Sequence, residues 1–121
     1  HKQNVLNLVT DQIGGPTPAR EIAMACLQMA KQLIQDPFKS GIYHYSGAPD
    51  ISWAELAVEI FKFTSIEMSI NPISTQQYPT PAKRPLNSRM DCSLTEQVFG
   101  IQQANWQYGL ENIIRELGVL K

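Results

Sequence analysis

Apolar residues recur along the chain with two different periods, and each period predicts one kind of element. The run over residues 5–9 is apolar and β-prone, which predicts a strand. From residue 18 to residue 35 apolar side chains recur every three to four positions, which predicts a helix. This helix ends before Asp36-Pro37, because the residue before a proline disfavours the helical conformation. The face expected to point inward carries Ile22, Cys26, Ala30 and Leu33, flanked by Ala23, Leu27 and Ile34.

Capping residues mark the starts of the later helices. The segments Ser52–Glu55 and Ser93–Glu96 both match a capping box, in which the serine caps the glutamate amide and the glutamate reaches back. Asn105 is placed to cap the last helix. The predicted helices cover residues 53–63, a short stretch from Ser93 that Gly100 ends, and residues 106–117.

Strands are few and short in the rest of the chain. Residues 41–47, bracketed by glycines, and residues 68–70 predict two of them. Four prolines between residues 71 and 91 are too many for a sheet interior, so this segment is expected to be an ordered, extended loop. Its expected apolar anchors are Ile73, Tyr78, Leu86 and Met90. The predicted class is α/β, with about four helices and two or three short strands that extend a sheet made by other residues.

The segment Asp11–Pro18, called the elbow below, follows the first predicted strand and leads into the first helix. Gly14 and Gly15 are expected to adopt backbone conformations that a Cβ would forbid. Thr17 is placed to cap the helix, with Pro18 at its first position. Polar loops after strands are where open α/β proteins hold ligands, although Asp11 and its neighbour also suit the simpler role of satisfying the turn's own backbone.

Composition and charge narrow the class of protein. The formal net charge of −1 gives no electrostatic footprint for nucleic acid, and no apolar run approaches the roughly 18–20 residues that span a bilayer. We therefore expect one cytoplasmic domain over residues 1–121, with neither nucleic acid nor membrane as partner. Because an interior-type strand begins close to His1, we expect the chain to be part of a longer protein. Cys26 and Cys92 are expected to be reduced structural thiols, although the sequence leaves a single bridge between them open.

Familiar catalytic and cofactor motifs are absent from the sequence. It contains no G-x-G-x-x-G loop, no Walker motif and no Y-x-x-x-K pair. No carboxylate pair at ligand spacing accompanies His44, which is expected to be half-buried with one hydrogen bond, so no metal site is predicted. Trp53 and Trp106 stand beside apolar neighbours at helix starts, which favours core or domain-contact packing over ligand stacking.

In addition to the elbow, the sequence contains a second polar cluster at residues 83–89. It brings together three cations, the amide of Asn87 and a hydroxyl. The planar guanidinium of Arg84 suits phosphate or carboxylate oxygens, and Asn87 suits a sugar or a phosphate. Alternatively, Arg84 and Arg89 only tie the proline-rich loop to helix C-termini or surface acids.

The two clusters, in this order and separation, resemble one family. Asp11–Thr17 looks like the D-Q-x-G-x-P-T element of dTDP-4-dehydrorhamnose reductases. Three later segments are similar to further elements of that family: residues 41–47 followed by Ser52-Trp53, residues 78–88 (Y-P-T-P-A-x-R-P-x-N-S), and Trp106 with Gly109-Leu110.

The resemblance implies the C-terminal, substrate-binding lobe of a Rossmann-type extended short-chain dehydrogenase/reductase. Enzymes of this family reduce dTDP-4-dehydro-L-rhamnose to dTDP-L-rhamnose with NADPH or NADH. In the family, the cofactor loop and the tyrosine–lysine pair lie in an N-terminal Rossmann domain, so no catalytic or cofactor-binding residue is expected in this chain, which alone should be inactive. From their chemistry, we expect Arg84 near the diphosphate of the dTDP-sugar, with Gln12 and Asn87 as hydrogen-bonding residues for the sugar or nucleotide.

A non-catalytic alternative stays open. The regulatory subunit of methionine adenosyltransferase resembles the same reductases but binds another protein. Self-association is also expected, because an uncovered edge of the first strand would invite a homodimer. The sequence leaves the choice between NADPH and NADH open.

Overall fold

The computed structural model describes residues 4–118. Four α-helices, two 3-10 turns and four short strands confirm the predicted α/β class. Their order along the chain is β1 (Val5–Val9), β2 (Ile13–Gly14), α1 (Ala19–Gln35), η1 (Pro37–Lys39), β3 (Ile51–Ser52), α2 (Trp53–Phe63), β4 (Ser69–Ile73), η2 (Thr75–Gln77), α3 (Ser93–Phe99) and α4 (Trp106–Glu116).

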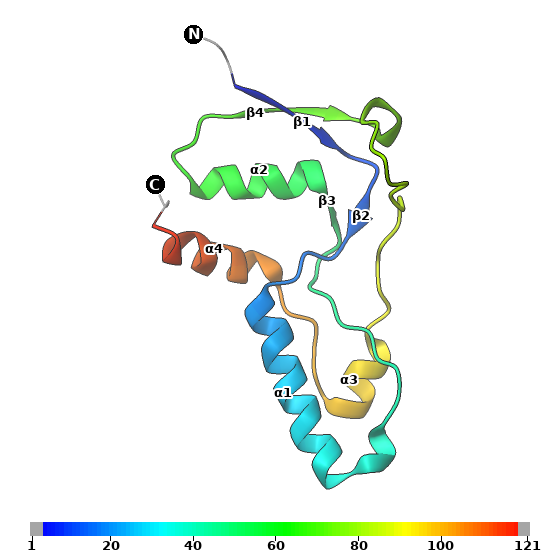
Figure 1. The fold of residues 1–121 in the computed structure, drawn as a ribbon. Helices are drawn as coiled ribbons and strands as arrows, with labels where there is room; N and C mark the ends of the chain where they lie inside the picture. The colour runs from blue at the N-terminus through cyan, green and yellow to red at the C-terminus, as the bar shows by residue number, and fades with distance from the viewer. Residues whose placement is uncertain (1–3, 119–121) are drawn as a thin grey trace.

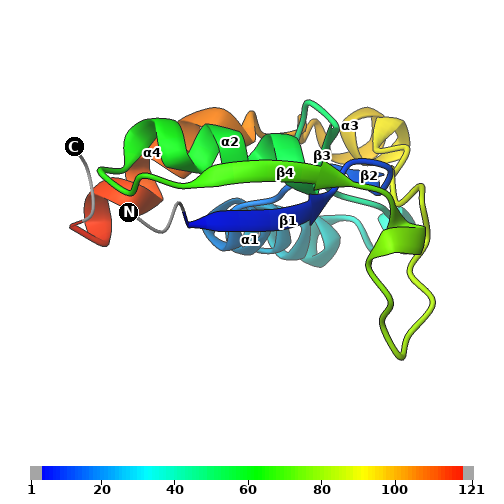
Figure 2. The same ribbon diagram turned by 90° about the horizontal axis from the view of Figure 1, so that it is seen from above.

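The strands form two small sheets. β1 and β4 run parallel from the pair Val5–Ser69 to the pair Val9–Ile73, and α2 packs against both (Figures 1 and 2). β2 and β3 form a two-residue antiparallel pair. The strand predicted at residues 68–70 is therefore real but continues to Ile73 through Pro72. An edge strand tolerates a proline because one side of its backbone needs no ladder partner.

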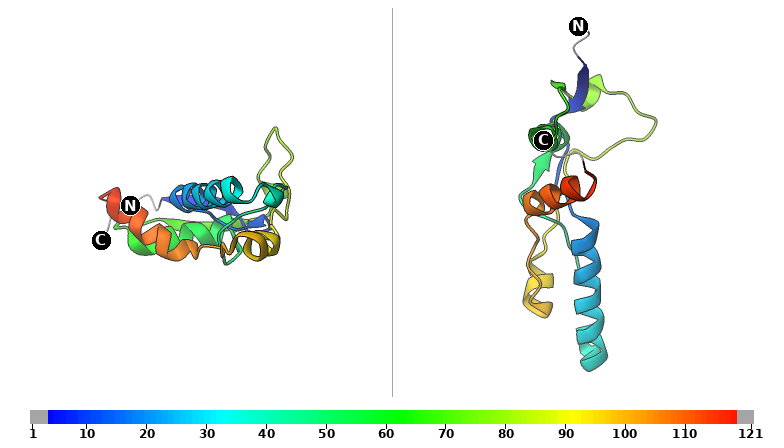
Figure 3. Two further views of the ribbon diagram at one scale, coloured as in Figure 1. Left: turned by 90° about the horizontal axis from the view of Figure 1, so that it is seen from below. Right: turned by 90° about the vertical axis from the view of Figure 1, so that its left-hand side faces the viewer.

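The helices α1 and α3 form a second part of the molecule, which lies below the strands in Figure 1. Its small core consists of Ala25, Phe99 and Ile101, and the ring of Tyr43 meets Phe99 edge-on with centroids 4.7 Å apart. The elbow connects this part to β1. The chain is elongated as a result, as the right-hand view in Figure 3 shows.

The prediction for α1 is correct in extent but only partly correct about the face that is buried. Only Ala25 of this helix is fully buried, and Met29 and Leu33 pack against the core from the same side. Ile34, by contrast, is 82% exposed. Ile22, Leu27 and Cys26 are exposed as well, and both cysteines of the chain are free thiols, with Cys92 buried.

The strand predicted over residues 41–47 does not form. This segment is extended, but side chains hold it in place of a neighbouring strand: Thr95 Oγ1 donates to the His44 carbonyl at 2.5 Å, and Gln103 Nε2 donates to the Ser46 carbonyl at 3.2 Å. Tyr43 and Tyr45 nevertheless pack against the core, as alternate residues of an extended segment do. His44 itself is exposed and not half-buried as predicted.

Of the three N-caps predicted for the later helices, two are confirmed. Ser52 Oγ accepts from the Glu55 amide at 3.2 Å and Glu55 Oε2 accepts from the Ser52 amide at 2.9 Å, so the capping box is complete. Asn105 Oδ1 accepts from the Gln107 amide. The box predicted at Ser93 is wrong, because Asp91 Oδ1 takes the Ser93 amide and α3 begins at Ser93 itself.

The proline-rich segment after η2 projects from the body of the molecule, as the yellow-green loop in Figures 2 and 3 shows. Tyr78, Leu86 and Met90 were predicted to anchor it, but each is about half exposed. The anchoring comes instead from backbone hydrogen bonds to the elbow, in which Ile13 donates to the Leu86 carbonyl and accepts from the Ser88 amide. The loop therefore depends on the elbow for its position.

Candidate functional site

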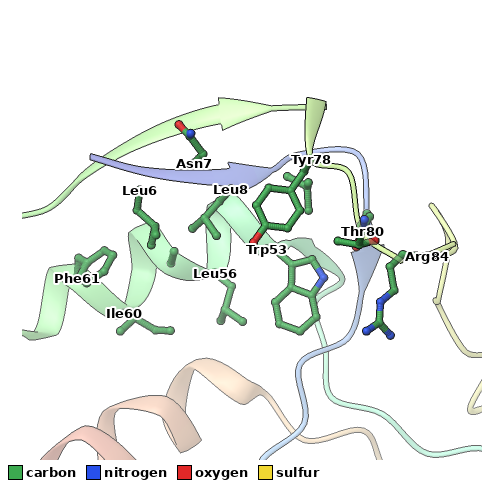
Figure 4. Close-up of a pocket in the computed structure, with 13 residues that line it drawn as sticks. Leu6, Asn7, Leu8, Trp53, Leu56, Ile60, Phe61, Tyr78, Thr80 and Arg84 are labelled. Carbon is green, nitrogen blue, oxygen red and sulfur yellow. The ribbon is translucent and has the colours of Figure 1, made fainter. Parts of the chain in front are cut away.

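A pocket of about 500 Å³ lies between β1, α2 and the projecting loop. Its floor is mostly apolar and comes from β1 and α2, whereas its polar side chains other than Asn7 come from the elbow and the loop. Figure 4 shows Trp53, Tyr78, Thr80 and Arg84 gathered at one end and apolar side chains at the other. This main pocket is lined by Leu6, Asn7, Leu8, Val9, Gln12, Trp53, Leu56, Ala57, Ile60, Phe61, Tyr78, Thr80 and Arg84.

A second pocket of about 360 Å³ shares part of this wall. Gln12, Trp53 and Leu56 line both pockets. The second pocket continues along the elbow from Gly14 to Thr17 and reaches Ser88. A ligand that extends past Trp53 can therefore contact the elbow over most of its length.

The elbow is connected to η2 by a set of hydrogen bonds centred on Thr75. The Asp11 carboxylate accepts from the Thr75 amide at 2.9 Å and from Thr75 Oγ1 at 2.6 Å. Gln12 Nε2 donates to the same Thr75 oxygen at 3.2 Å. The Thr75 hydroxyl, followed by the Thr75 amide, lowers the pKa of Asp11 below its ordinary value, so this carboxyl is ionised at neutral pH. Asp11 and Gln12 thus bind a segment 63–64 positions away.

The glycines of the elbow are required for close packing and not for an unusual backbone conformation. Within residues 4–118, positive φ occurs only at Gly100 and Gly118. A Cβ on Gly15 would overlap the carbonyl oxygen of Gly47, and a Cβ on Gly47 would overlap that of Pro16. The prediction that Gly14 and Gly15 need forbidden conformations is therefore wrong.

Thr17 supports this close approach and does not cap α1 as predicted. Its Oγ1 accepts from the Gly47 amide at 2.9 Å and donates to the Gly15 carbonyl at 2.9 Å. Pro18 is the N-cap residue of α1 and not its first helical residue. The hydroxyl thus joins the two segments at the point where their backbones meet.

The structure brings two of the three predicted site residues together. Gln12 and Arg84 line the main pocket, and Arg84 makes no ion pair or hydrogen bond within residues 4–118. Asn87 does not line it. Asn87 Oδ1 accepts from the amide and Nη1 of Arg89, at 3.1 and 3.4 Å. Arg89 Nε in turn lies 3.7 Å from a carboxylate oxygen of Asp50. For Arg89, this ion pair agrees with the alternative interpretation of the cluster, in which its arginines bind surface acids.

Sequence reasoning missed the aromatic side chains of the pocket. Trp53 is 58% exposed, so it is not a core residue and only the domain-contact part of the expectation is left for it, whereas Trp106 is 2% exposed and packs in the core as expected. The helical spacing of Trp53 with Leu56, Ala57 and Ile60 places it on the pocket side of α2, and this spacing was visible in the sequence. The sequence did not show which residues lie opposite that side, because Tyr78 comes from a loop distant in the sequence.

Metal and membrane features are not found in the part of the chain that the structure describes. Residues 4–118 contain no group of three or more His, Cys, Asp or Glu side chains placed to hold a metal ion. None of their helices combines the length and apolar character that crossing a bilayer requires.

A parallel strand pair covered by a helix, with polar residues just after the first strand, defines an α/β ligand-binding domain. The family model described as the RmlD substrate binding domain matches residues 1–119, and the chain belongs to this family. The resemblance inferred from the sequence motifs is thereby confirmed.

Individual relatives agree with this assignment. A dTDP-4-dehydrorhamnose reductase from Aggregatibacter actinomycetemcomitans is 42% identical over 118 residues, which are 92% of this chain and 40% of the relative. The crystal structure of a dTDP-4-dehydrorhamnose reductase from Clostridium acetobutylicum is similar with a TM-score of 0.84 at 32% identity, over 97% of this chain and 40% of that one. The reductase from Bacillus anthracis, solved in complex with NADP, gives a TM-score of 0.78 at 29% identity, over 95% of this chain and 39% of that one. The chain spans about 40% of the length of the curated relatives that it matches.

Proposed function

We propose that the chain is the substrate-binding part of a dTDP-4-dehydrorhamnose reductase, which reduces dTDP-4-dehydro-L-rhamnose to dTDP-L-rhamnose. The family membership and the reductases among its relatives support this activity. In this proposal the main pocket is one wall of the active-site cleft. The NADPH- or NADH-binding Rossmann domain, with the groups that transfer hydride and proton, forms the other wall, so the domain is inactive alone.

The main observation behind the proposal is the polar end of the main pocket. Arg84 is a cation without a protein partner in residues 4–118, and it lines the same pocket as the exposed rings of Trp53 and Tyr78. A guanidinium presents planar donors that match the oxygens of a diphosphate, and aromatic rings present faces to a base or a sugar. The apolar floor lowers the local dielectric and strengthens the attraction between Arg84 and an anion.

Gln12 and Asn87 complete the proposed binding residues with unequal support. Gln12 is in the pocket wall and carries an amide suited to a sugar or base. Asn87 has its oxygen occupied by Arg89, so only its Nδ2 is left to meet a ligand. We therefore assign Asn87 a contact at the edge of the site, toward Ser88 of the second pocket.

We also propose that the Rossmann domain joins this chain at β1. Val5 is 55% exposed and Leu6 39% exposed, although both belong to a strand. Within residues 4–118, β1 pairs only with β4, so its second edge has free backbone groups. An uncovered apolar strand edge requires a partner, and a neighbouring parallel strand of the same protein satisfies it.

The test is steady-state kinetics of the complete reductase with Arg84→Ala. Loss of a charge-assisted hydrogen bond costs about 1.5–3 kcal/mol, so the KM for dTDP-4-dehydro-L-rhamnose should rise about 10-fold to 100-fold. The KM for NADPH should stay unchanged. Arg20→Ala is the control, because that exposed arginine pairs with Glu116 and lines neither pocket.

Two outcomes would contradict the proposal in different ways. An unchanged KM for the dTDP-sugar in Arg84→Ala would remove the diphosphate role. A wild-type protein that turns over no dTDP-4-keto sugar would favour the non-catalytic regulatory-subunit alternative.

A further inference from the structure

The hydrogen bonds around Thr75 determine which atom of Gln12 is available to a ligand. An ionised carboxylate only accepts hydrogen bonds, so the single hydroxyl proton of Thr75 points to Asp11. Thr75 Oγ1 is then left with lone pairs and requires a donor from Gln12. The group of Gln12 that lies 3.2 Å away must therefore be its NH₂, as the structure has it.

The amide oxygen of Gln12 is left without a partner by this arrangement. Within residues 4–118 no hydrogen bond involves Gln12 Oε1, whereas the side chain lines both pockets. The lowered pKa of Asp11 keeps the carboxylate ionised, which maintains the direction of every hydrogen bond in the set.

We propose that Asp11, acting through Thr75, orients the Gln12 amide so that Oε1 accepts a hydrogen bond from an N–H or O–H group of the bound sugar nucleotide. Asp11 and Thr75 are positioning residues, and only Gln12 contacts the ligand. The inference rests on the proposed function and adds a requirement to it: the ligand group opposite Gln12 is a donor. A thymine N3–H and a hexose hydroxyl both satisfy this requirement.

The experiment is carried out on the complete reductase with Asp11→Asn. The Thr75 amide lies 2.9 and 3.0 Å from the two Asp11 oxygens, and the Thr75 hydroxyl lies 2.6 Å from the first of them. An asparagine that gives its oxygen to the amide at the second position therefore offers its NH₂ to the hydroxyl. The hydroxyl proton is then free to turn to Gln12, and the Gln12 amide reverses. The KM for the dTDP-sugar should rise about fivefold to tenfold, the cost of one hydrogen bond, with kcat within twofold of wild type.

Further variants distinguish positioning from a general structural role. Thr75→Val should raise KM as Asp11→Asn does, and Thr75→Ser should recover most of that loss because it keeps the hydroxyl. Gln12→Leu should raise KM by a similar factor, and the double variant with Asp11→Asn should be no worse than Gln12→Leu alone. Thr10→Val is the control, because Thr10 Oγ1 donates to the Ile73 carbonyl at the same junction. The inference would be overturned if the two increases in KM multiplied in the double variant, or if Asp11→Asn and Thr75→Val changed the Tm without changing the KM.

Binding of dTDP, which lacks the hexose, separates the two sources of the donor. If the donor is thymine N3–H, Gln12→Leu weakens dTDP itself and does not weaken an N3-methylated dTDP further. If the donor is a hexose hydroxyl, dTDP binds equally well to both proteins and only the KM of the dTDP-sugar rises. If Gln12→Leu changes neither the affinity for dTDP nor the KM for the dTDP-sugar while wild type turns over the substrate, the inference fails and the proposed function stands.

Discussion

Thr95 gives a sharp test of how the segment around residues 41–47 is held without a strand partner. Its side chain is 0% exposed, and its Oγ1 donates to the His44 carbonyl at 2.5 Å. Thr95→Val keeps the shape of the side chain and removes the donor. Because the carbonyl loses its partner beside a buried methyl group, we expect a loss of about 1–3 kcal/mol in the free energy of unfolding.

Thr95→Ser is the matched variant, because it keeps the hydroxyl and removes one buried methyl group. Its cost should be about 1 kcal/mol, which is less than that of Thr95→Val. Urea unfolding followed by the fluorescence of the buried Trp106 measures both. With a slope of about 1–3 kcal/mol per molar urea, a 2 kcal/mol loss lowers the midpoint by about 1 M. A valine variant within about 0.5 kcal/mol of wild type, or one more stable than the serine variant, would refute the reasoning.

Three further predictions concern stability. Gly47→Ala forces a Cβ against backbone across the elbow and should cost about 3 kcal/mol or more, whereas Gly41→Ala meets only a side-chain ring and should cost far less in the same urea titration. Ser52→Ala removes the cap of α2 and should lower the free energy of unfolding by about 1 kcal/mol. Stability should fall in acid, because hydrogen bonds lower the pKa of both Asp11, through Thr75, and Glu55, through the Ser52 amide. A lowered folded-state pKa gives stability that is present above the ordinary carboxyl pKa of about 4 and is lost as the pH falls through the folded value.

Each of these has a clear contrary result. Equal midpoints for the two glycine variants would mean that the elbow adjusts to an added Cβ. A wild-type midpoint for Ser52→Ala would mean that α2 does not depend on its cap. Asp11→Asn should flatten the decline in Tm below the ordinary carboxyl pKa of about 4, and a decline as steep as in wild type would exclude that carboxyl as a contributor.

Elements defined by neighbouring residues were predictable from the sequence. The capping box at Ser52 involves residues three positions apart, and both of its hydrogen bonds form. The same pattern at Ser93 fails although the residues match. The reason is competition: Asp91, two residues upstream, takes the Ser93 amide, and Thr95 is drawn into a bond with the His44 carbonyl 51 positions away.

The site depends on contacts that no local pattern contains. Gln12 and Arg84 were selected for their chemistry, and their common pocket arises because the elbow binds η2 and the loop of residues 78–88. The sequence could not show that Trp53 is exposed, because the exposure of a helix residue depends on what lies opposite that face of the helix. The role predicted for Gly15 was wrong for the same reason, since its close approach to Gly47 is evident only when the two segments are seen together.

The meeting of Gly15 and Gly47 has a consequence for protein engineering. Because each backbone occupies the space that the other's Cβ would need, the two segments can be transplanted only as a pair. A chimaera that exchanges residues 11–18 alone would pack the new segment against residues 46–50 of the original protein, which do not match it. A chimaera that moves both segments keeps the fit, so the smallest exchangeable unit that contains the elbow is discontinuous in sequence.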